Sequence, residues 1–404
     1  MIARENKKAV RLKNDDPIYV FHADSRVAAA LFVLTADAVG ARLDTGDTAR
    51  DRQSERGEGN LEQAKKTKKI LLIATGGTIA STQGENGLEP SLGAGDLMGM
   101  LAAGHPGTAF LLSNLLSLDS SNIQPEHWQA IAREIYRNLK LEDAPDGFIV
   151  IHGTDTMAYT ASALAFMLRN LRVPVVLTGS QIPMENPISD GPHNMQTAIA
   201  AVCADIRGVT VAFGGRIING TRSRKASSTC LSAFESVSAP PMASVTANGL
   251  EVAASATGFV DDKTSTGLED VLCADVFLLK LIPGTKPELL TALPDLGYRG
   301  VVIEAFGAGG MHCLGRDLVE RVRFLRSRGL AVVVCTQCLA GGVDLSVYEV
   351  GHRLFEAGVI EGRDMTTEAA VTKLMWALGK TGDPRGVEAI FRTNYAGEIT
   401  LRTR

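Results

Sequence analysis

Hydrophobic residues occur along most of this chain in short unbroken runs that alternate with segments of helical periodicity. An apolar run of about four to eight residues is typical of a buried strand, and apolar residues every three or four positions are typical of a helix. Alternating strands and helices form βαβ units, in which a mostly parallel sheet carries helices on both faces. In the first half of the chain we expect strands at 70–74, 147–151, 173–179 and 209–213, and helices at 124–139, 160–171 and 194–206.

A second alternating block follows after a break. The break, near 237–266, contains SAPPMAS and DDKTSTG and has few periodic apolar positions, so it predicts a connection between domains. The second block has strand-like runs at 276–284, 300–310 and 330–338, and helix-like segments at 287–293, 317–329 and 368–379. We therefore predict an α/β protein with a larger N-terminal and a smaller C-terminal parallel-sheet domain. The predicted boundaries are 1–68 for an N-terminal extension and charged linker, 69–240 for the large domain, 241–268 for the interdomain linker and 269–404 for the small domain.

The N-terminal extension differs in composition from the rest of the chain. Residues 41–69 are close to half charged and almost without apolar content. Such a segment buries too little surface to offset its ordering entropy, so we expect a solvated, disordered linker. The most signal-like run, VAAALFVL at 27–34, lies late in the chain behind several acidic residues. We interpret it as a short helix or strand of the extension rather than as a signal peptide.

Composition excludes several classes of protein. The formal net charge of −4 over 404 residues argues against a nucleic-acid binder, which normally has a basic excess, and leaves only contact with RNA through a local patch as an alternative. No apolar run approaches the ~20 residues that span a bilayer, so we expect no membrane partner. The six cysteines form no disulfide framework, and the pair in CTQC at 335–338 lacks the second pair that a zinc site needs. We expect reduced thiols in a cytoplasmic protein, with a redox role for this pair as the weaker alternative.

Two predicted strands end in threonine beside glycine. TGGT follows the strand at 70–74, and HGTDT, with Thr154 and Asp155, follows the strand at 147–151. The carboxyl ends of parallel strands are where α/β proteins bind ligands. A phosphate cradle is disfavoured, because TGGTIA lacks both the Lys-Ser/Thr of a P-loop and the third glycine of a dinucleotide fingerprint. A third segment, DSSN at 119–122, precedes a helix; taken singly, such residues are also typical helix caps and turns.

Taken in order, TGGTIA, DSS, HGTDT and VVLTGSQIPMENPISDGPHN resemble the bacterial-type L-asparaginase family, and more closely its cytosolic type I branch. The resemblance covers about 69–404 and leaves the N-terminal extension outside. It implies that Thr78 is the primary nucleophile and that Thr154 is the second catalytic threonine. In the segment GGRIINGTRSRKASS, it identifies Lys225 as the catalytic lysine.

The resemblance also implies a substrate and the residues that bind it. Asp155 would bind the α-amino group of L-asparagine and Ser120 its α-carboxylate, with Ser121 and Thr154 as further substrate-binding candidates; L-glutamine would be a weaker substrate. For Ser121, a plain helix cap is the competing interpretation. No metal or organic cofactor is implied.

The implied chemistry is physically coherent. A threonine hydroxyl is a weak nucleophile at pH 7, so Thr78 needs a base or a proton relay within hydrogen-bond reach. Lys225 would serve either as a base with a lowered pKa or electrostatically through Thr154, and the sequence leaves both open. Backbone N–H groups of the glycine turns would bind the developing oxyanion, at ~3 kcal/mol per donor. Thr78 would attack the side-chain amide, ammonia would leave, and water would release aspartate.

One departure from the family concerns a tyrosine. Many relatives carry a tyrosine on the loop after the first threonine, whereas this chain has Leu88 near that place, and leucine cannot relay a proton. A subset of type I relatives uses a tyrosine of the second domain instead, which would be Tyr348 here; an ordinary half-buried tyrosine is the alternative. In the family this domain completes the active site of a neighbouring subunit, which implies a homodimer or homotetramer.

Two alternative functions remain open. The D subunit of the archaeal glutamyl-tRNA(Gln) amidotransferase resembles the same core, and a catalytically inactive amide-sensing relative is the second alternative.

A second departure from the family concerns regulation. Some type I enzymes bind asparagine at an allosteric site through an arginine that would fall at Glu304 here. A glutamate would repel the ligand's carboxylate, so we expect that form of allostery to be absent.

Overall fold

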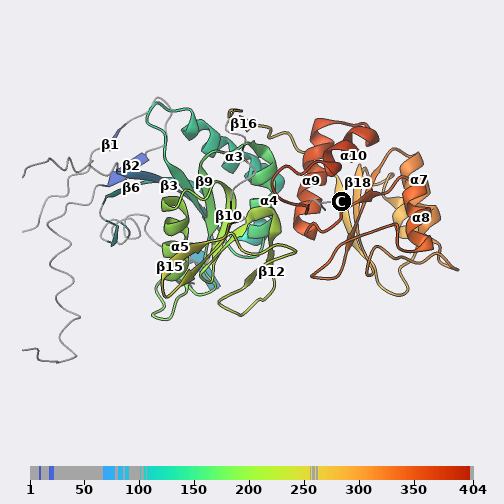
Figure 1. Ribbon diagram of the computed structural model, residues 1–404, viewed down its shortest axis with the longest axis horizontal. Coiled ribbons are helices and arrows are strands. Elements are labelled where there is room, and N and C mark those ends of the chain that lie inside the picture. The colour runs from blue at the N-terminus through green and yellow to red at the C-terminus, as the bar shows by residue number, and fades with distance from the viewer. Residues whose placement is uncertain are drawn as a thin grey trace, which may run out of the picture.

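The structure is a computed structural model with two α/β domains that lie side by side (Figure 1). It describes residues 9–10, 18–21, 67–77, 81–84, 87–90, 101, 104–105, 107–254, 256, 260 and 263–400. The predicted fold class, with a larger N-terminal and a smaller C-terminal sheet domain, is confirmed.

The large domain is built on one sheet of ten strands. In spatial order these are β1 (Ala9–Val10), β2 (Ile18–Phe21), β6 (Thr108–Leu118), β3 (Lys68–Gly76), β7 (Gly147–Ile151), β9 (Pro174–Thr178), β10 (Gly208–Phe213), β11 (Arg216–Asn219), β14 (Ala243–Thr246) and β15 (Gly249–Val252). The strands from β6 to β10 run parallel, and those outside them are antiparallel. Parallel central strands buried on both faces explain why the sequence shows unbroken apolar runs there.

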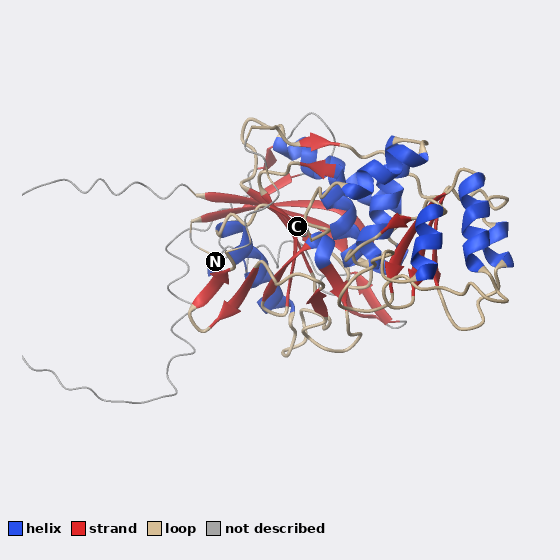
Figure 2. Ribbon diagram, turned by 45° about the vertical axis from the view of Figure 1, so that its right-hand side comes forward, coloured by secondary structure: helices blue, strands red, loops and turns tan. Residues whose placement is uncertain are grey.

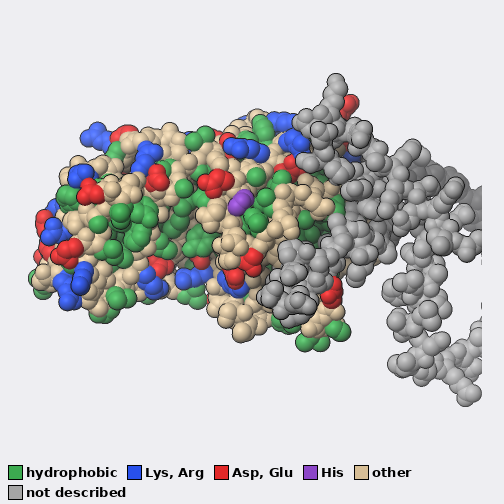
Figure 3. Space-filling view, turned by 180° about the vertical axis from the view of Figure 1, so that it is seen from behind, with side chains coloured by type: hydrophobic (Ala, Val, Ile, Leu, Met, Phe, Trp, Pro, Cys, Tyr) green, Lys and Arg blue, Asp and Glu red, His purple; other side chains and the backbone are tan. Residues whose placement is uncertain are grey.

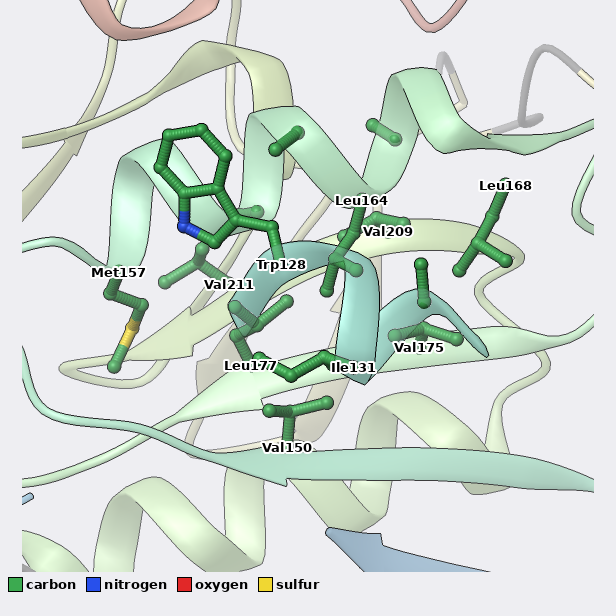
Figure 4. Close-up of a cluster of buried hydrophobic side chains, with 14 of the residues drawn as sticks. Trp128, Ile131, Val150, Met157, Leu164, Leu168, Val175, Leu177, Val209 and Val211 are labelled. Atoms are coloured by element: carbon green, nitrogen blue, oxygen red, sulfur yellow. The ribbon is translucent and has the colours of Figure 1, made fainter. Parts of the chain in front are cut away.

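Each face of the large sheet is covered by helices. On one face lie α3 (Pro125–Leu139) and α4 (Met157–Met167), and on the other lies α5 (Gly191–Cys203). Successive residues of β3 divide between the faces, because side chains alternate along a strand: Leu71 faces the first cluster and Leu72 the second. Figure 4 shows the first cluster, in which Trp128 and Ile131 of α3 meet strand residues such as Val150.

The small domain contains a parallel sheet with helices on both faces (Figure 2). Its strands are β17 (Val276–Lys280), β18 (Gly300–Ala305), β19 (Ala331–Thr336) and β20 (Ile360–Glu361). One face carries α6 (Glu288–Ala292), α7 (Leu318–Ser327) and α8 (Glu349–Glu356). The other face carries α9 (Thr367–Lys380) and α10 (Pro384–Arg392).

Helix α9 joins the two domains. It packs against α4, and its Trp376 stacks on Phe166 with ring centroids 5.8 Å apart, which makes Trp376 part of the large-domain core. Lys373 of the same helix is fully buried and donates to Glu398 at 2.5 Å. A buried charge is stable only when it is paired, so this ion pair fixes the segment after α10 against α9.

Two predicted boundaries differ from the structure. Within the N-terminal extension, β2 pairs with β6 and adds to the large sheet, while most of the extension lies outside the described residues. The predicted linker 241–268 contains β14 and β15, a hairpin of the large sheet, and β16 (Gly267–Leu268), which pairs with β8 (Leu168–Arg169). Strands of two to four residues are too short to produce a periodic signal.

Helices α4 and α5 each begin three residues before the predicted start, at Met157 and Gly191. In α5, Pro192 occupies the first turn, where proline is favoured because that turn's N–H groups have no partner within the helix. Glycine, proline and polar residues in the first turn hid the start of α5 from a prediction based on apolar spacing, whereas α4 begins with the buried Met157 and Ala158, which the prediction left out.

Candidate active site

Three neighbouring strands of the large sheet end at the same edge and carry the motif loops. Gly76, at the end of β3, has φ +110°, and a Cβ there would lie 2.2 Å from the backbone oxygen of Leu118. Gly77 has φ +93°, and a Cβ there would lie 2.4 Å from the backbone nitrogen of Gly153. Only glycine adopts these conformations without strain and allows the loops to lie this close. Gly77 therefore brings the first motif against the second, and Gly76 brings it against the end of β6.

The threonines of the first motif separate into two groups. Thr75 is buried and donates to the backbone oxygen of Ile151 at 2.8 Å, so its hydroxyl ties β3 to β7. Thr78, the predicted nucleophile, lies outside the described residues. Leu88 belongs to β5 (Gly87–Pro90), which forms a hairpin with β4 (Ser81–Gly84), and its side chain is likewise outside the described part of the structure. The roles predicted for these two residues stay predictions.

The structure brings together Lys225, Thr154 and Asp155, which are about 70 residues apart in the chain. Nζ of Lys225 donates to Oγ1 of Thr154 at 2.7 Å and to Oδ1 of Asp155 at 2.7 Å. The lysine side chain is 18% exposed, whereas that of Asp155 is 62% exposed. Lys225 ends β12 (Ser223–Lys225), a short strand that pairs with β13 (Phe234–Ser236). The cluster thus combines a largely covered cation, a hydroxyl and an accessible carboxylate.

Gln181 completes the hydrogen bonding of Thr154, and sequence reasoning missed it. Oγ1 of Thr154 donates to Oε1 of Gln181 at 3.0 Å, while the Gln181 amide nitrogen donates to the backbone oxygen of Ser228 at 3.1 Å. The backbone N–H of Gln181 donates to both carboxylate oxygens of Asp190. Because the amide nitrogen has its own acceptor, the orientation of the Gln181 side chain is fixed with its oxygen toward Thr154. Its place just after the predicted strand at 173–179 was the signal that could have found it.

Ser120 and Ser121 have different surroundings. Ser120 is buried at the start of the short 3₁₀ helix η2 (Ser120–Asn122), and its Oγ accepts from the backbone N–H of Asp155 at 3.2 Å. Since this oxygen accepts, its O–H can donate to a ligand carboxylate. Ser121 instead donates both its backbone N–H and its hydroxyl to Asp119, at 2.8 and 2.6 Å. These bonds lower the pKa of Asp119, which is the N-cap of η2, so Ser121 lies within the capped turn and is not itself a helix cap.

His152 holds the backbone of the second motif loop, HGTDT at 152–156, through hydrogen bonds of its ring. Its Nδ1 donates to the backbone oxygen of Gly153 at 2.7 Å, and its Nε2 accepts from the hydroxyl of Thr160 at 2.9 Å. Complete burial lowers the pKa of His152 to about 4, so the ring is neutral near pH 7. A neutral ring with both nitrogens occupied cannot shuttle protons, and His152 instead fixes the shape of the loop that carries Thr154.

Tyr348 lies in the small domain, at the N-cap of α8, with 61% of its surface exposed. The side chain of Tyr348 is therefore more exposed than that of the ordinary half-buried tyrosine that was the alternative interpretation. Among the described residues, the structure does not place its hydroxyl in hydrogen-bond contact with Thr154, Asp155 or Lys225. Tyr348 is therefore accessible to another molecule, and its catalytic role stays a prediction.

The remaining candidates from the sequence have structural explanations. Cys335 is buried, which raises the pKa of its thiol to about 12 and disfavours redox chemistry with the exposed Cys338. Glu304 is buried, and its carboxylate accepts a hydrogen bond from the Thr367 hydroxyl at 2.5 Å. The same carboxylate forms an ion pair with Nζ of Lys280 at 3.3 Å. Within the described ranges, no group of three or more His, Cys, Asp or Glu side chains could hold a metal ion, and no helix is long and apolar enough to cross a membrane.

Comparison with known proteins identifies relatives over most of the chain. The chain is 43% identical over 338 residues to the L-asparaginase of Thermococcus kodakarensis, covering 82% of this chain and 99% of the relative. It is 37% identical over 364 residues to the D subunit of the glutamyl-tRNA(Gln) amidotransferase from Pyrococcus furiosus, covering 85% of this chain and 80% of the relative.

Solved structures and family models agree with these relatives. The thermostable L-asparaginase from Thermococcus kodakarensis matches with a TM-score of 0.77 at 42% identity, covering 83% of this chain and all of that one. L-asparaginase I from Vibrio cholerae matches with a TM-score of 0.73 at 33% identity, covering 83% of this chain and 99% of that one. The family model "Asparaginase, N-terminal" matches residues 69–257, and "Glutaminase/Asparaginase C-terminal domain" matches residues 275–391. The resemblance inferred from the motifs is thereby confirmed, and the chain belongs to the asparaginase family.

Proposed function

We propose that this protein is an amidohydrolase that converts L-asparagine to L-aspartate and ammonia through an acyl-enzyme on Thr78. The observation that carries the proposal is the contact of Lys225 with both Thr154 and Asp155 at the edge where the parallel strands end. Acyl transfer to a threonine requires a polarised hydroxyl, a positive charge near it and backbone donors for an oxyanion, and this edge supplies the first two beside a glycine turn.

The geometry favours the electrostatic alternative for Lys225. Nζ of Lys225 lies 2.7 Å from both Oγ1 of Thr154 and the carboxylate oxygen Oδ1 of Asp155, so a positive charge there is paired, and Thr154 donates its own proton to Gln181. A positive charge 2.7 Å from Oγ1 of Thr154 stabilises negative charge on that oxygen. Thr154 can then relay a proton: it takes one from the attacking hydroxyl of Thr78 while giving its own to the leaving nitrogen, and in the second half-reaction it takes one from water while giving its own to the Thr78 oxygen.

The proposed steps balance without a cofactor. Thr78 Oγ forms an ester with the side-chain carbonyl carbon of asparagine, the carbon–nitrogen bond breaks, and ammonia leaves with the proton from the threonine. Water then attacks the ester, which releases aspartate and restores the hydroxyl. Substrate binding rests on Asp155, whose exposed carboxylate suits an α-ammonium group, and on Ser120, whose O–H suits an α-carboxylate.

Ammonia release from L-asparagine and L-glutamine by the purified protein tests the proposal. We expect turnover of asparagine, with kcat/KM for glutamine lower by about ten- to 200-fold, because one extra methylene is worth ~1–3 kcal/mol in a fitted pocket. Preference for glutamine would favour the activity named for the amidotransferase D subunits. Failure to hydrolyse either amide would contradict the proposal and leave the amide-sensing alternative.

The asparaginase function outweighs the D-subunit function on present observations. The chain covers 99% of the Thermococcus kodakarensis L-asparaginase at 43% identity, but 80% of the Pyrococcus furiosus amidotransferase chain at 37% identity. On the face shown in Figure 3, acidic and basic side chains are interspersed, which does not favour a broad basic surface for tRNA on that face.

The proposal includes a homodimer or homotetramer in the cytoplasm, with Tyr348 supplied by a neighbouring subunit. Exposed apolar side chains occur in the same segment, with Val347 directly before this tyrosine 55% exposed and Phe355 near the end of α8 61% exposed. Hydrophobic side chains also gather on the small-domain half of the face in Figure 3. Such surface is typical of a subunit contact. The six cysteines are all free, as expected in a reducing compartment.

Tyr348→Phe is expected to lower kcat for asparagine by about 10²-fold or more, because it removes a hydroxyl that takes part in proton transfer. Tyr298→Phe, in the same domain and packed edge-to-face against Phe277, is the matched control and should retain activity. Mixing inactive Tyr348→Phe and Lys225→Met subunits should restore activity if sites are completed across subunits, since one mixed site then has both groups intact. Full activity of Tyr348→Phe would show that the tyrosine is dispensable.

A further inference from the structure

Arg222 lies three residues before Lys225, and its side chain is 2% exposed. It ends the short 3₁₀ helix η3 (Gly220–Arg222), directly before β12. Its guanidinium extends to the small domain and to the segment after α10, while Lys225 contacts Thr154 and Asp155. A fully buried arginine is rare unless all its donors are satisfied, so the contacts of this one are specific.

The guanidinium of Arg222 has four hydrogen bonds. Nε donates to the backbone oxygen of Gly397 at 2.7 Å, and Nη1 donates to the backbone oxygen and Oδ2 of Asp364 at 2.9 and 3.0 Å. Nη2 donates to the hydroxyl of Thr400 at 3.3 Å, and that hydroxyl donates to Oδ2 of Asp364 at 2.6 Å. Burial alone would raise the pKa of Asp364, but the bonds from Thr400 and the charge of Arg222 lower it, so Asp364 is ionised at neutral pH.

The segment 396–400 is itself firmly held. The backbone oxygen of Ala396 accepts from Asn219 at 2.9 Å and from Thr221 at 3.2 Å, both just before Arg222. Glu398 accepts from the buried Lys373 of α9 and from the backbone N–H groups at 395 and 396. Arg222 is therefore fixed to an anchor that spans the small domain and the segment after α10.

The strand that carries Lys225 is only three residues long and packs on α4. Among the described elements, β12 pairs only with β13 and forms a two-stranded sheet outside the ten-stranded one. An isolated pair of short strands is marginally stable by itself. The backbone oxygen of Arg222 accepts from Val237 N–H at 2.9 Å, which continues this pair by one bond. The side chain of Arg222 links this segment to Asp364 of the small domain, alongside the bond from the Thr366 hydroxyl to the backbone oxygen of Thr221 at 3.4 Å.

We propose that Arg222, held by Asp364, Thr400 and Gly397, is a positioning residue that sets the place of Lys225 relative to Thr154. This inference rests on the proposed function, in which Lys225 acts on Thr154. A displacement of about 1 Å at a reacting group costs on the order of 10²-fold in rate, so a fixed guanidinium three residues away controls turnover without touching substrate. The small domain thereby supports the lysine site of its own chain.

Arg222→Lys tests this inference because it keeps the charge and loses the planar set of donors. We expect kcat for asparagine to fall by about 30- to 100-fold, with KM changed by less than about threefold. Thr400→Val removes only the hydroxyl that joins Arg222 and Asp364, and we expect it to lower kcat by about three- to tenfold. Arg353→Lys is the matched control, because Arg353 pairs with Asp317 at 3.1 Å within the small domain, away from β12.

A second readout does not use the reaction. The acylation rate of Lys225 by an amine-reactive reagent, followed by peptide mass spectrometry without substrate, should rise several-fold in Arg222→Lys and Thr400→Val and stay at the wild-type rate in Arg353→Lys. If Lys225 reactivity and kcat in both test variants match the control, the inference is overturned, even if the variants melt at lower temperature. If the wild-type protein hydrolyses neither amide but Lys225 reactivity rises as stated, the positioning role holds and the proposed function fails.

Discussion

Lys225→Met is expected to lower kcat for L-asparagine by about 10³- to 10⁴-fold, which corresponds to ~4–5.5 kcal/mol of lost transition-state stabilisation. The side chain donates to Thr154 and Asp155 at 2.7 Å each and is mostly covered, so methionine keeps its length while removing the charge. Without that charge, negative charge on Oγ1 of Thr154 is no longer stabilised. Steady-state ammonia release measures the effect.

The control for this substitution is Lys380→Met. Lys380 forms an exposed ion pair with Glu269 at 2.7 Å, and such surface pairs contribute little to stability, so the control should keep wild-type turnover. Circular dichroism should show both variants folded. A Lys225→Met protein with more than about a tenth of wild-type kcat would exclude the proposed role of the lysine.

Thr78→Ala is expected to abolish turnover, with a loss of more than about 10⁴-fold, because no acyl-enzyme can form without the hydroxyl. The fold should be retained, since the contacts that place the loop come from Gly76 and Gly77. Intact-protein mass spectrometry after an acid quench should detect an aspartyl adduct on the wild-type protein and none on the variant.

The same loop provides a control in Thr75→Val. The hydroxyl of Thr75 donates to Ile151 at 2.8 Å beneath the loop, so its removal should cost about 1–3 kcal/mol of stability and leave the chemistry in place. Wild-type activity in Thr78→Ala would reject Thr78 as the nucleophile and direct attention to Thr154.

The sequence predicted the parts of the fold that depend on long apolar runs. The strands at 147–151 and 209–213 match β7 and β10 closely, because their residues are buried on both faces of the sheet. The hairpin β14–β15 was missed, since four-residue strands with exposed faces resemble a loop in composition. The start of α5 was missed because its first turn contains glycine, proline and polar residues.

In the candidate site, too, the residues next to a strong strand signal could be predicted, and those placed by tertiary contacts could not. Thr154 and Asp155 follow a strong strand signal, so their place at the sheet edge could be predicted from the residues alone. That Lys225 meets them could not, because β12 is a short strand distant in sequence, and only the family resemblance indicated it. Gln181 was missed because its hydrogen bonds with Thr154 and Ser228 are tertiary contacts, and its position just after a predicted strand was the one local signal.

Both tryptophans of the protein, Trp128 and Trp376, belong to one hydrophobic cluster, although they come from different domains. Intrinsic tryptophan emission therefore follows the solvation of that cluster and of the seam where α9 meets α4. The cluster formed by α6, α7 and α8 on the far side of the small sheet contains no tryptophan. A fluorescence melt consequently reports on the junction of the domains and is silent about unfolding that begins on that outer face.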